Sequence, residues 1–323
     1  MIRVGIVGYG NLGRGVEAGL AHAPDMELVG VFTRRAPQTV DTQAPVYPLA
    51  NILDYKDQID VLILCGGSLA DIPDQGPMLA ARFNTVDSYD NHSKINEYYQ
   101  QMDTIAKQAG TVCVISTGWD PGLFSLQRVI GEAVLPSGVT NTFWGPGVSQ
   151  GHSDAIRRIS GVKAAVQYTL PKEAAMESVR KGEAGELTNA ERHTRECFVV
   201  LEEGAHPEVV RQTIVTMPAY FEGYHTTVHF ITMEELKANH SGIPHGGTVL
   251  RTGRTGSKGT LANYSFTLEL GSNPEFTASV DIAYARACYR LAEEGAYGAK
   301  TVLDIPPKYL SASTEEELRK YKI

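Results

Sequence analysis

The sequence predicts an α/β fold in which a doubly wound parallel sheet is followed by a second, α+β domain. Residues 3–7 alternate like the start of a buried strand, a glycine-rich turn follows at 8–13, and apolar residues then continue at helical spacing. The continuous apolar run 59–65 is typical of a strand that is buried on both faces of a parallel sheet. Further apolar runs at 27–32 and 111–116 are separated by helical segments, which is the pattern of a Rossmann-type sheet.

The glycine turn after the first strand is suited to a dinucleotide. Gly8 permits the tight turn, Gly10 lets the backbone approach a pyrophosphate, and Gly13 lets the following helix pack close to the strand. The motif alone also fits a purely structural turn, but the strand and the helix that it requires are both present. We therefore expect the cofactor to be held by Gly8, Tyr9, Gly10, Asn11, Leu12 and Gly13.

The second strand, residues 27–32, ends in Thr33-Arg34-Arg35 about twenty residues after the glycines, where an NAD enzyme usually has an acidic residue on the ribose hydroxyls. No carboxylate stands there. Two guanidinium groups and a hydroxyl suit a 2′-phosphate, because arginine presents a fork of donors that matches phosphate oxygens. We therefore predict NADP as the cofactor; the alternative is a solvated arginine pair on a loop.

The rest of the first domain is expected to alternate between strands and helices. The polar stretch 36–45 is interpreted as a loop, and the strand 59–65 ends in a Gly-Gly-Ser turn at the edge of the sheet where ligands bind. We expect this turn to line the cofactor through Cys65, Gly66, Gly67 and Ser68. The remaining predicted elements are a short strand 46–50, a helix 71–82, a strand with its terminal loop 84–92, a helix 94–109 and a strand 111–116.

Three polar or aromatic residues follow the carboxyl ends of the last two strands. Asp90 lies past the strand that begins at residue 84, and Trp119 and Asp120 lie in the segment that closes the strand 111–116. Ligands of doubly wound sheets bind outside these strand ends, so we expect the three residues to face the nicotinamide half of the site. Asp120 could instead cap the next helix, Asp90 could hold its own turn, and Trp119 could be a core aromatic.

Size and composition exclude several classes of protein. A chain of 323 residues is long enough for two domains, and we predict a dinucleotide-binding domain 1–118, a substrate-binding and dimerisation domain 119–270, and a C-terminal helix and tail 271–323 that returns to the first domain. The net charge of −8 argues against a nucleic-acid or anionic-membrane partner. Four dispersed cysteines without a CxxC pair, a strand that starts at residue 2 and no apolar stretch of bilayer length lead us to expect a soluble, cytoplasmic enzyme. We see no cluster of metal ligands.

The second domain is expected to be a mixed, open sheet with helices on one face. A helix 123–135 precedes the stretch 142–154, which is rich in glycine and hydrogen-bonding groups. This stretch is interpreted as a loop that carries functional side chains. The other predicted elements are strands 162–169, 196–202, 224–232, 243–250 and 261–270, helical material 173–182, a mobile loop 252–259, and a long helix 273–291 that packs on the first domain or on a partner subunit.

Along nearly its whole length the chain resembles one family, the meso-diaminopimelate D-dehydrogenases. The resemblance is most specific from Trp144 to Asp154 and in Tyr168-Thr-Leu-Pro171, whereas the tip 254–260 and the C-terminal tail are less similar. The other motifs that carry it are Val7-Gly-Tyr-Gly-Asn-Leu-Gly-Arg14, Val86-Asp-Ser-Tyr-Asp-Asn-His92, Ser116-Thr-Gly-Trp-Asp-Pro-Gly122, Pro244-His-Gly-Gly247 and Asn273-Pro-Glu-Phe-Thr-Ala-Ser279.

The resemblance implies a homodimer that catalyses NADP-dependent oxidative deamination of the D-centre of meso-2,6-diaminopimelate to L-2-amino-6-oxopimelate and ammonia. In reverse, the reaction makes diaminopimelate for lysine and cell-wall synthesis. By the same resemblance, Thr169, Arg195 and His245 hold the distal L-carboxylate, and Asp90 and Asp120 lie at the amino group that is oxidised. The resemblance also implies that Gln150 and Asp154 shape the distal end.

The substrate has a carboxylate and an ammonium at each end, so its pocket needs hydrogen-bond donors twice and acceptors twice. Arg195, His245, Thr169 and Asn273 are suitable donors, Asp90, Asp120 and Asp154 are suitable acceptors, and Trp119 and Trp144 are suited to wall the site. Without the resemblance, an arginine such as Arg195 would more often be a solvated charge, and His245 could serve only its own turn. Two other functions remain open: an NADP reductase of the saccharopine- or dihydrodipicolinate-reductase type, and a non-catalytic NADP sensor that binds a protein partner.

Overall fold

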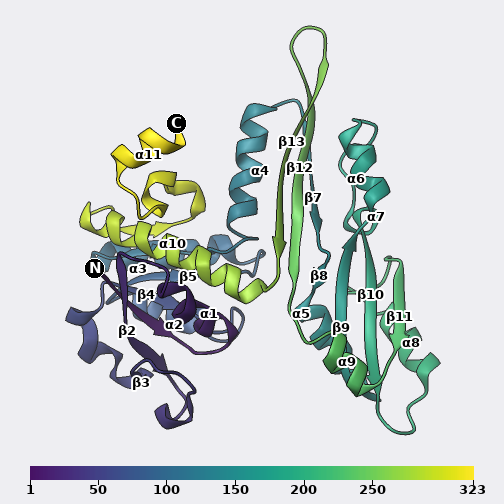
Figure 1. Cartoon of the computed structure of the whole chain (residues 1–323), viewed down its shortest axis with the longest axis horizontal. Helices are drawn as coiled ribbons and strands as arrows, with labels where there is room; N and C mark the ends of the chain where they lie inside the picture. The colour runs from purple at the N-terminus through teal and green to yellow at the C-terminus, as the bar shows by residue number, and fades with distance from the viewer. The chain divides into compact units, whose positions relative to one another are not determined.

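The computed structural model describes residues 1–323 and divides into two compact units (Figure 1). The first unit comprises Met1–Leu126 and Pro274–Ile323, and the second comprises Gln127–Asn273. The first unit thus extends eight residues beyond residue 118, the predicted end of the dinucleotide-binding domain. The chain re-enters the first unit at Pro274, so the first unit contains both chain ends.

The first unit is built on a seven-stranded parallel sheet in the order β14-β6-β5-β4-β1-β2-β3. This confirms the predicted Rossmann-type sheet. The edge strand β14, which pairs with β6, is not anticipated from the sequence because it has only three residues and no apolar run. The strands are β1 Ile2–Val7, β2 Met26–Thr33, β3 Val46–Pro48, β4 Val61–Leu64, β5 Asn84–Asp87, β6 Val112–Val114 and β14 Gly298–Lys300.

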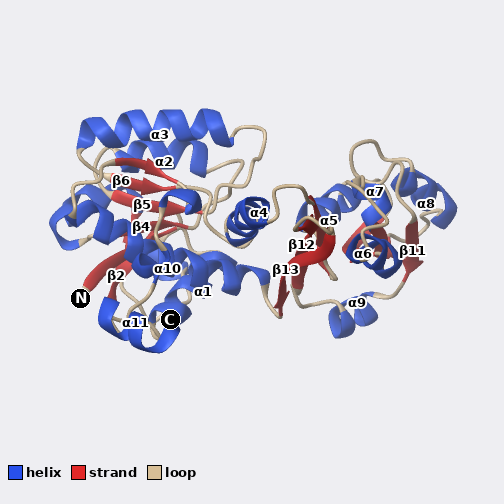
Figure 2. Cartoon of the chain, turned by 90° about the horizontal axis from the view of Figure 1, so that it is seen from above, coloured by secondary structure: helices blue, strands red, loops and turns tan.

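Helices cover both faces of this sheet (Figure 2). Because side chains alternate along a strand, Val61 and Ile63 of β4 join the core formed with α1 (Asn11–Leu20) and α10 (Asn273–Glu293). Leu62 and Leu64 join the opposite core, formed with α2 (Ile72–Ala80) and α3 (Ile95–Ala109). Burial on both faces explains why β4 is a continuous apolar run. Four 3₁₀ segments complete this unit: η1 Pro37–Thr39, η2 Leu49–Gln58, η3 Val302–Asp304 and η4 Pro307–Leu310.

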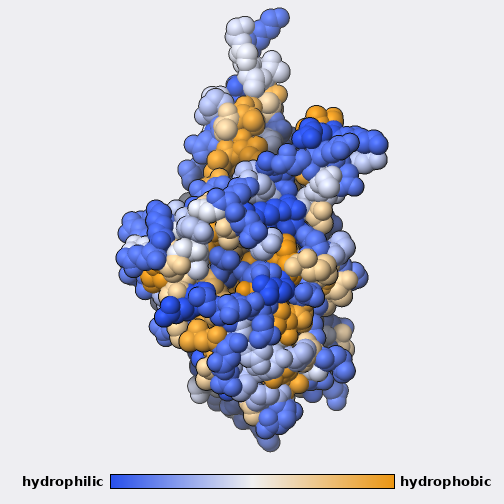
Figure 3. Space-filling model, turned by 90° about the vertical axis from the view of Figure 1, so that its left-hand side faces the viewer, coloured by the Kyte–Doolittle hydropathy of each residue, from blue (hydrophilic) through white to orange (hydrophobic).

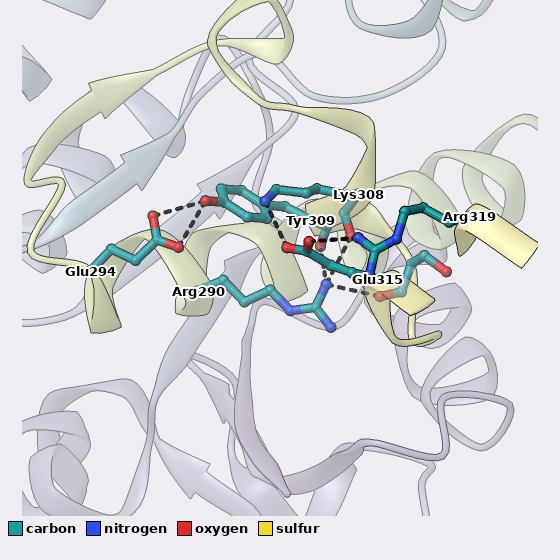
Figure 4. A network of polar contacts seen from close by, with 7 residues as sticks. Arg290, Glu294, Lys308, Tyr309, Glu315 and Arg319 are labelled. Atoms are coloured by element: carbon teal, nitrogen blue, oxygen red, sulfur yellow. Dashed lines mark hydrogen bonds and ion pairs between the residues drawn. The ribbon is translucent and has the colours of Figure 1, made fainter. Parts of the chain in front are cut away.

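A polar network ties the C-terminal segment, which ends in α11 (Glu315–Lys322), to α10 (Figure 4). Arg290 Nη1 donates to the carbonyls of Lys308, Tyr309 and Ser311 at 2.9–3.1 Å. The Tyr309 hydroxyl donates to Glu294, and Lys308 pairs with Glu315 at 2.7 Å. These contacts satisfy the carbonyls of the 3₁₀ turn η4 and hold the tail on the surface of its own unit.

The second unit contains two sheets rather than the single open sheet predicted. One is four-stranded in the order β11-β10-β9-β8, with β10 and β11 parallel and the other pairs antiparallel. The other is a three-stranded antiparallel sheet in the order β13-β12-β7. The strands are β7 Val139–Trp144, β8 Gly147–Val148, β9 Val162–Pro171, β10 His193–Leu201, β11 Thr226–Phe230, β12 His245–Thr255 and β13 Thr260–Leu270.

The prediction of a loop at 142–154 is wrong. This stretch contains the end of β7, the two-residue strand β8 and the first turns of α5. Its glycines serve close packing: a Cβ on Gly147 would lie 2.6 Å from the Cα of His245, and one on Gly145 would lie 2.0 Å from the carbonyl oxygen of Thr169. The helices of this region are α4 Leu123–Val134, α5 Gln150–Arg157, α6 Glu173–Arg180, α7 Asn189–Arg192, α8 Pro207–Val215 and α9 Met233–Asn239.

The predicted loop 252–259 is also shorter than expected. Residues Thr252 to Thr255 remain paired with β13 in a long hairpin, so only residues 256–259 form the turn. Gly256 and Gly259 both have positive φ, at 65° and 62°, which explains the glycines at this turn.

Apolar surface is limited to separate patches on the face seen in Figure 3. Leu53, Leu69 and Met78 are among the exposed apolar side chains of the first unit. None of the helices, including the 21-residue α10, has the length and the apolar character that a bilayer span requires.

Candidate active site

A cavity of about 330 Å³ opens at the carboxyl ends of β1, β2 and β4 in the first unit. It is lined by residues 7–10, 32–35, 49, 65–67, 71 and 75. Most of the residues predicted to hold the cofactor therefore lie together, namely Gly8, Tyr9, Gly10, Thr33, Arg34, Arg35, Cys65, Gly66 and Gly67. Asn11, Leu12, Gly13 and Ser68 do not line the cavity.

The glycine turn fits a bound pyrophosphate. Gly8 has a φ of 88°, and a Cβ on Gly13 would lie 2.4 Å from the carbonyl oxygen of Gly8, so both positions need glycine. A Cβ on Gly10 would meet nothing within 4 Å, which leaves open space above the turn. Gly10 is also the N-cap of α1, and no side chain caps this helix. The amides at the start of α1 are thus positioned to receive an anion.

The two arginines after β2 are held in different ways. Arg34 is exposed, and its Nη2 pairs with the Asp71 carboxylate at 2.5 Å. Arg35 Nη2 donates to the carbonyl oxygen of Tyr9 at 2.5 Å, and its backbone N–H donates to the Thr33 hydroxyl. Two guanidinium groups and a hydroxyl thus lie at one end of the cavity, as a phosphate site requires. Asp71 is not predicted from the sequence as a cofactor-site residue, although it stands three residues after Ser68 at the N-cap of α2.

Hydrogen bonds connect the loops that carry Asp90, Trp119 and Asp120. The backbone N–H of Asp90 donates to the Ser68 hydroxyl at 2.9 Å, which joins the loops after β4 and β5. Trp119 is buried, and its ring meets the edge of Phe124 at a centroid distance of 5.3 Å. The structure therefore places these predicted residues at the carboxyl ends of β5 and β6, in the same unit as the cavity.

Two buried carboxyl groups lie behind these loops, and the sequence does not reveal either. Asp87 accepts from the backbone N–H groups of Tyr89 and Ser116 and from the Tyr98 hydroxyl, while burial raises its pKa to about 6. Asp281 of α10 accepts from the Thr117 hydroxyl at 2.5 Å. Burial, opposed by this hydrogen bond, raises the pKa of Asp281 to about 8. Asp87 and Asp281 together fix the residues that precede Trp119.

The second unit contains a buried arginine without a carboxylate partner from that unit. Arg195 lies opposite Thr169 in the β9–β10 register, and its Nη1 donates to the Thr169 hydroxyl. Arg195 is 8% exposed, its guanidinium lies 4.3 Å from the centroid of the Tyr224 ring, and its Nε has no hydrogen-bond partner. Burial lowers the pKa of this guanidinium, which stays charged at neutral pH. Such a group is suited to bind an incoming carboxylate.

His193, which the sequence analysis missed, fixes the position of Trp144. The backbone N–H of Trp144 donates to His193 Nε2 at 2.8 Å, and His193 Nδ1 lies 3.0 Å from the carbonyl oxygen of Asn189. The proton is therefore on Nδ1, and burial lowers the pKa of this imidazole to about 4. The Trp144 and His193 rings stack at 5.4 Å, and the Arg192 guanidinium lies 5.6 Å from the Trp144 ring.

His245 lies near the Thr169–Arg195 pair, because Gly147 contacts both His245 and Thr169. Gly147 pairs with Thr169 in the β8–β9 register and packs against the backbone of His245, the first residue of β12. His245 Nδ1 lies 2.8 Å from the backbone nitrogen of Gly246 and 3.1 Å from its carbonyl oxygen, so this side of the ring faces the Gly246 backbone. The backbone N–H of Asn273 donates a hydrogen bond to the carbonyl oxygen of Ile243 at 2.9 Å. Gly147 of β8 thus lies beside both Thr169 of β9 and His245 of β12, and Arg195 faces Thr169 from β10.

Gln150 and Asp154 lie in the first turns of α5 and are exposed. Asp154 forms an ion pair with Arg157 on the same helix. His152 lies between them and is half-buried; its Nδ1 is 2.7 Å from the Ser149 hydroxyl. Burial first, and then the charge of Arg195, lowers the pKa of His152 to about 4. The neutral His152 is a further residue near Arg195 that the sequence does not indicate.

No group of three or more His, Cys, Asp or Glu side chains is arranged to hold a metal ion.

The features described above are those of a dinucleotide cavity in one unit and a buried cationic site in the other. Each fits one of the two ligands that a dehydrogenase brings together.

Comparisons with known proteins support this assignment. The family model of the diaminopimelic acid dehydrogenase C-terminal domain matches residues 118–272. The meso-diaminopimelate D-dehydrogenase of Ureibacillus thermosphaericus is 60% identical over 99% of this chain and 98% of its own. The enzyme of the same name from Corynebacterium glutamicum is 51% identical over 98% of each chain.

Solved structures agree with the sequence comparisons. The C. glutamicum DAP dehydrogenase in complex with DAP has a TM-score of 0.92 and 50% identity, and covers 100% of this chain and 99% of that chain. An engineered D-amino acid dehydrogenase bound to NADP⁺ has a TM-score of 0.87 and 48% identity, with coverage of 100% and 99%. This chain therefore belongs to the meso-diaminopimelate D-dehydrogenase family, whose members are oxidoreductases that use a nicotinamide cofactor.

Proposed function

We propose that the chain catalyses the reversible NADP-dependent oxidative deamination of the D-centre of meso-2,6-diaminopimelate. In balanced form, substrate, NADP⁺ and water give L-2-amino-6-oxopimelate, ammonium, NADPH and a proton. The reverse direction consumes ammonia and NADPH and supplies diaminopimelate for lysine biosynthesis. The names of the similar enzymes and the DAP-bound relative support this substrate.

The single observation that carries the proposal is the state of Arg195. Its guanidinium is buried, donates to the Thr169 hydroxyl, lies against the Tyr224 ring, and has an Nε without a hydrogen-bond partner. A buried cation without a counter-ion is unfavourable, so its maintenance is best explained by a ligand that supplies the negative charge. The distal L-carboxylate of the substrate is that ligand in our account, with His245 as a further donor.

The other end of the substrate has to be deprotonated before it is oxidised. Only the neutral amine can assist the departure of hydride from Cα, so a carboxylate must first take a proton from the ammonium group. Asp120 and Asp90 are the two candidates for this base, acting directly or through a water molecule. When bound, NADP⁺ accepts the hydride at C4 of its nicotinamide ring. Water then adds to the resulting substrate imine and ammonia leaves. Trp119 and Trp144 would limit the entry of other solvent.

The choice of NADP rests on the end of the cavity that carries Thr33, Arg34 and Arg35. These donors suit a 2′-phosphate, and no carboxylate stands at the carboxyl end of β2, where an acidic residue would bind ribose hydroxyls. The NADP⁺-bound engineered relative supports the same choice. We propose that Gly8, Gly10 and the start of α1 bind the pyrophosphate of the same cofactor.

We also propose a homodimer in the cytoplasm. Helix α4 exposes Val129, Ile130 and Val134 at 47%, 37% and 59%, an apolar face that a second copy could cover. The four cysteines are all buried and unpaired, as expected for a protein kept in a reducing compartment.

The direct test is an absorbance assay of NADPH formation with meso-diaminopimelate, with the ammonia released counted in parallel. We expect one ammonia for each NADPH, and much faster reduction of NADP⁺ than of NAD⁺. NADPH binding without turnover would support a non-catalytic sensor, and turnover of a cyclic dicarboxylate in place of diaminopimelate would support the reductase alternative.

A further inference from the structure

One carboxylate, that of Asp71, contacts two different walls of the dinucleotide cavity. Its Oδ1 pairs with Arg34 Nη2 at 2.5 Å, and its Oδ2 accepts the backbone N–H of Gly67 at 2.8 Å. Arg34 comes from the end of β2, whereas Gly67 belongs to the turn after β4. Asp71 therefore bridges the arginine side and the glycine side of the cavity.

The two partners of this ion pair differ in mobility. The Asp71 side chain is only 18% exposed, and it is fixed by Gly67 and by its place at the start of α2. The Arg34 side chain is 68% exposed, and Asp71 is its ion-pair partner. Arg34 can therefore turn toward a ligand, while Asp71 stays where it is.

We propose that Asp71 determines how strongly the chain discriminates between phosphorylated and unphosphorylated dinucleotides, because it holds Arg34 until a 2′-phosphate displaces it. This inference rests on the proposed use of NADP. NADP has to break the Arg34–Asp71 pair and place a dianion near a fixed carboxylate. NAD leaves the pair intact. Asp71 thus weakens NADP binding selectively.

The arginine–phosphate interaction is stronger than the Arg34–Asp71 ion pair, so a bound 2′-phosphate displaces the carboxylate. An exposed ion pair shifts an equilibrium by at most about fivefold. A charge-assisted hydrogen bond from arginine to phosphate is worth roughly 10- to 100-fold. The exchange therefore favours the phosphate. Arg35 needs no such exchange, since it is held by the carbonyl oxygen of Tyr9 rather than by an acid.

The test compares Asp71→Asn with the wild type, using dissociation constants of NADPH and NADH measured by fluorescence on the full chain. Asparagine keeps an oxygen for the Gly67 N–H but cannot hold Arg34 by charge. We expect NADPH to bind about two- to fivefold more tightly and NADH to change less than twofold. Asp74→Asn is the matched control, because Asp74 is an exposed acid of the same helix that does not line the cavity.

Three results would overturn the inference: unchanged NADPH affinity in Asp71→Asn, equal changes for NADPH and NADH, or the same selective gain in Asp74→Asn. A double-mutant cycle with Arg34→Ala makes the test sharper, because the gain from Asp71→Asn should vanish when Arg34 is absent. A gain that persists there means that Asp71 acts without Arg34. Asp71→Ser, which also keeps an acceptor near Gly67, repeats the test if the asparagine variant does not fold.

Failure of the proposed cofactor choice is distinguishable from failure of this inference. If the wild type binds NADPH and NADH equally, the NADP preference is wrong and the role of Asp71 falls with it. If the wild type prefers NADPH and Asp71→Asn leaves that preference unchanged, only the role of Asp71 is wrong.

Discussion

Thr169 and Arg195 lie opposite each other on β9 and β10, and Arg195 donates a hydrogen bond to the Thr169 hydroxyl. This pair holds a buried guanidinium at a fixed position with one side, Nε, still without a partner. A ligand carboxylate satisfies this group, whereas a ligand without one leaves it buried and unpaired. The pair therefore predicts how the enzyme chooses among D-amino acids.

The first prediction concerns this choice. Wild-type enzyme should be poor on D-alanine and D-leucine, because each unpaired polar group left in the site costs about 1–3 kcal/mol. The triple variant Arg195→Met, Thr169→Ile and His245→Asn removes these groups and adds apolar surface. Its kcat/KM should fall for meso-diaminopimelate and rise for D-leucine, with unchanged affinity for NADPH.

Arg180→Met serves as the control for this variant, because Arg180 is a partly exposed residue of α6 whose guanidinium pairs with Glu173 and Glu177. It should leave the preference as it is. Parallel loss of both activities in the triple variant, or full retention of meso-diaminopimelate activity, would show that these three residues are not the carboxylate site.

The second prediction concerns the base. Asp120→Asn should lower turnover by roughly two to four powers of ten, since an amide cannot accept the ammonium proton, and should leave NADPH binding normal. Stopped-flow measurement of the first turnover separates this step from product release. Asp90→Asn is the companion variant: if it shows the larger loss while Asp120→Asn turns over almost normally, Asp90 is the base.

The third prediction concerns the cofactor. Replacing Arg34 and Arg35 by alanine should weaken NADP binding by about 1.5–3 kcal/mol for each lost contact and change NAD binding little. Calorimetric titration with the two dinucleotides measures both values. Equal losses would mean that the arginines bind a part common to NAD and NADP, such as the pyrophosphate.

The fourth prediction follows from the buried carboxyl group of Asp281. Its pKa is raised from 3.8 to about 8, chiefly by burial, so the folded state binds more protons than the unfolded state between these values. Stability should therefore fall as pH rises from about 4 to 8. Asp281→Asn cannot ionise, and its unfolding temperature should exceed that of the wild type by a margin that grows over this range. The ceiling is roughly 4 kcal/mol at pH 7.

Asp25→Asn is a control for which the opposite change in unfolding temperature is expected at neutral pH. Two hydrogen bonds from Arg286, at 2.6 and 2.7 Å, lower the pKa of Asp25. This carboxylate therefore stabilises the fold at pH values above its unfolded-state pKa. Removing its charge should lower the unfolding temperature at pH 7. If the difference in unfolding temperature between Asp281→Asn and the wild type does not grow in favour of the variant from pH 4 to pH 8, the raised pKa assigned to Asp281 is wrong.

The first unit could be predicted well because its signals are local. The alternation of apolar runs and helices identifies the sheet, and Gly8, Gly10 and Gly13 identify the turn after β1. What could not be predicted depends on contacts distant in sequence. The strand β14 reaches the sheet only after the whole second unit, and Asp71 meets Arg34 across 37 residues.

The second unit was harder to predict for a physical reason. Glycine is typical of loops, so residues 142–154 were interpreted as one, whereas Gly145 and Gly147 are there because strands pack too closely for a Cβ. The Trp144–His193 hydrogen bond spans 49 residues, and no sequence period reveals it. The resemblance to the family supplied Thr169, Arg195 and His245, which local pattern alone would leave among ordinary polar residues.

The most direct test of the central claim is a comparison of meso-, LL- and DD-diaminopimelate as separate substrates in the NADPH-formation assay. The proposed mechanism requires a D-centre at the nicotinamide and an L-centre whose carboxylate is bound by Arg195. It therefore predicts rapid turnover of the meso isomer, none of the LL isomer, and poor turnover of the DD isomer. Equal turnover of the meso and DD isomers, or any substantial turnover of the LL isomer, would contradict it.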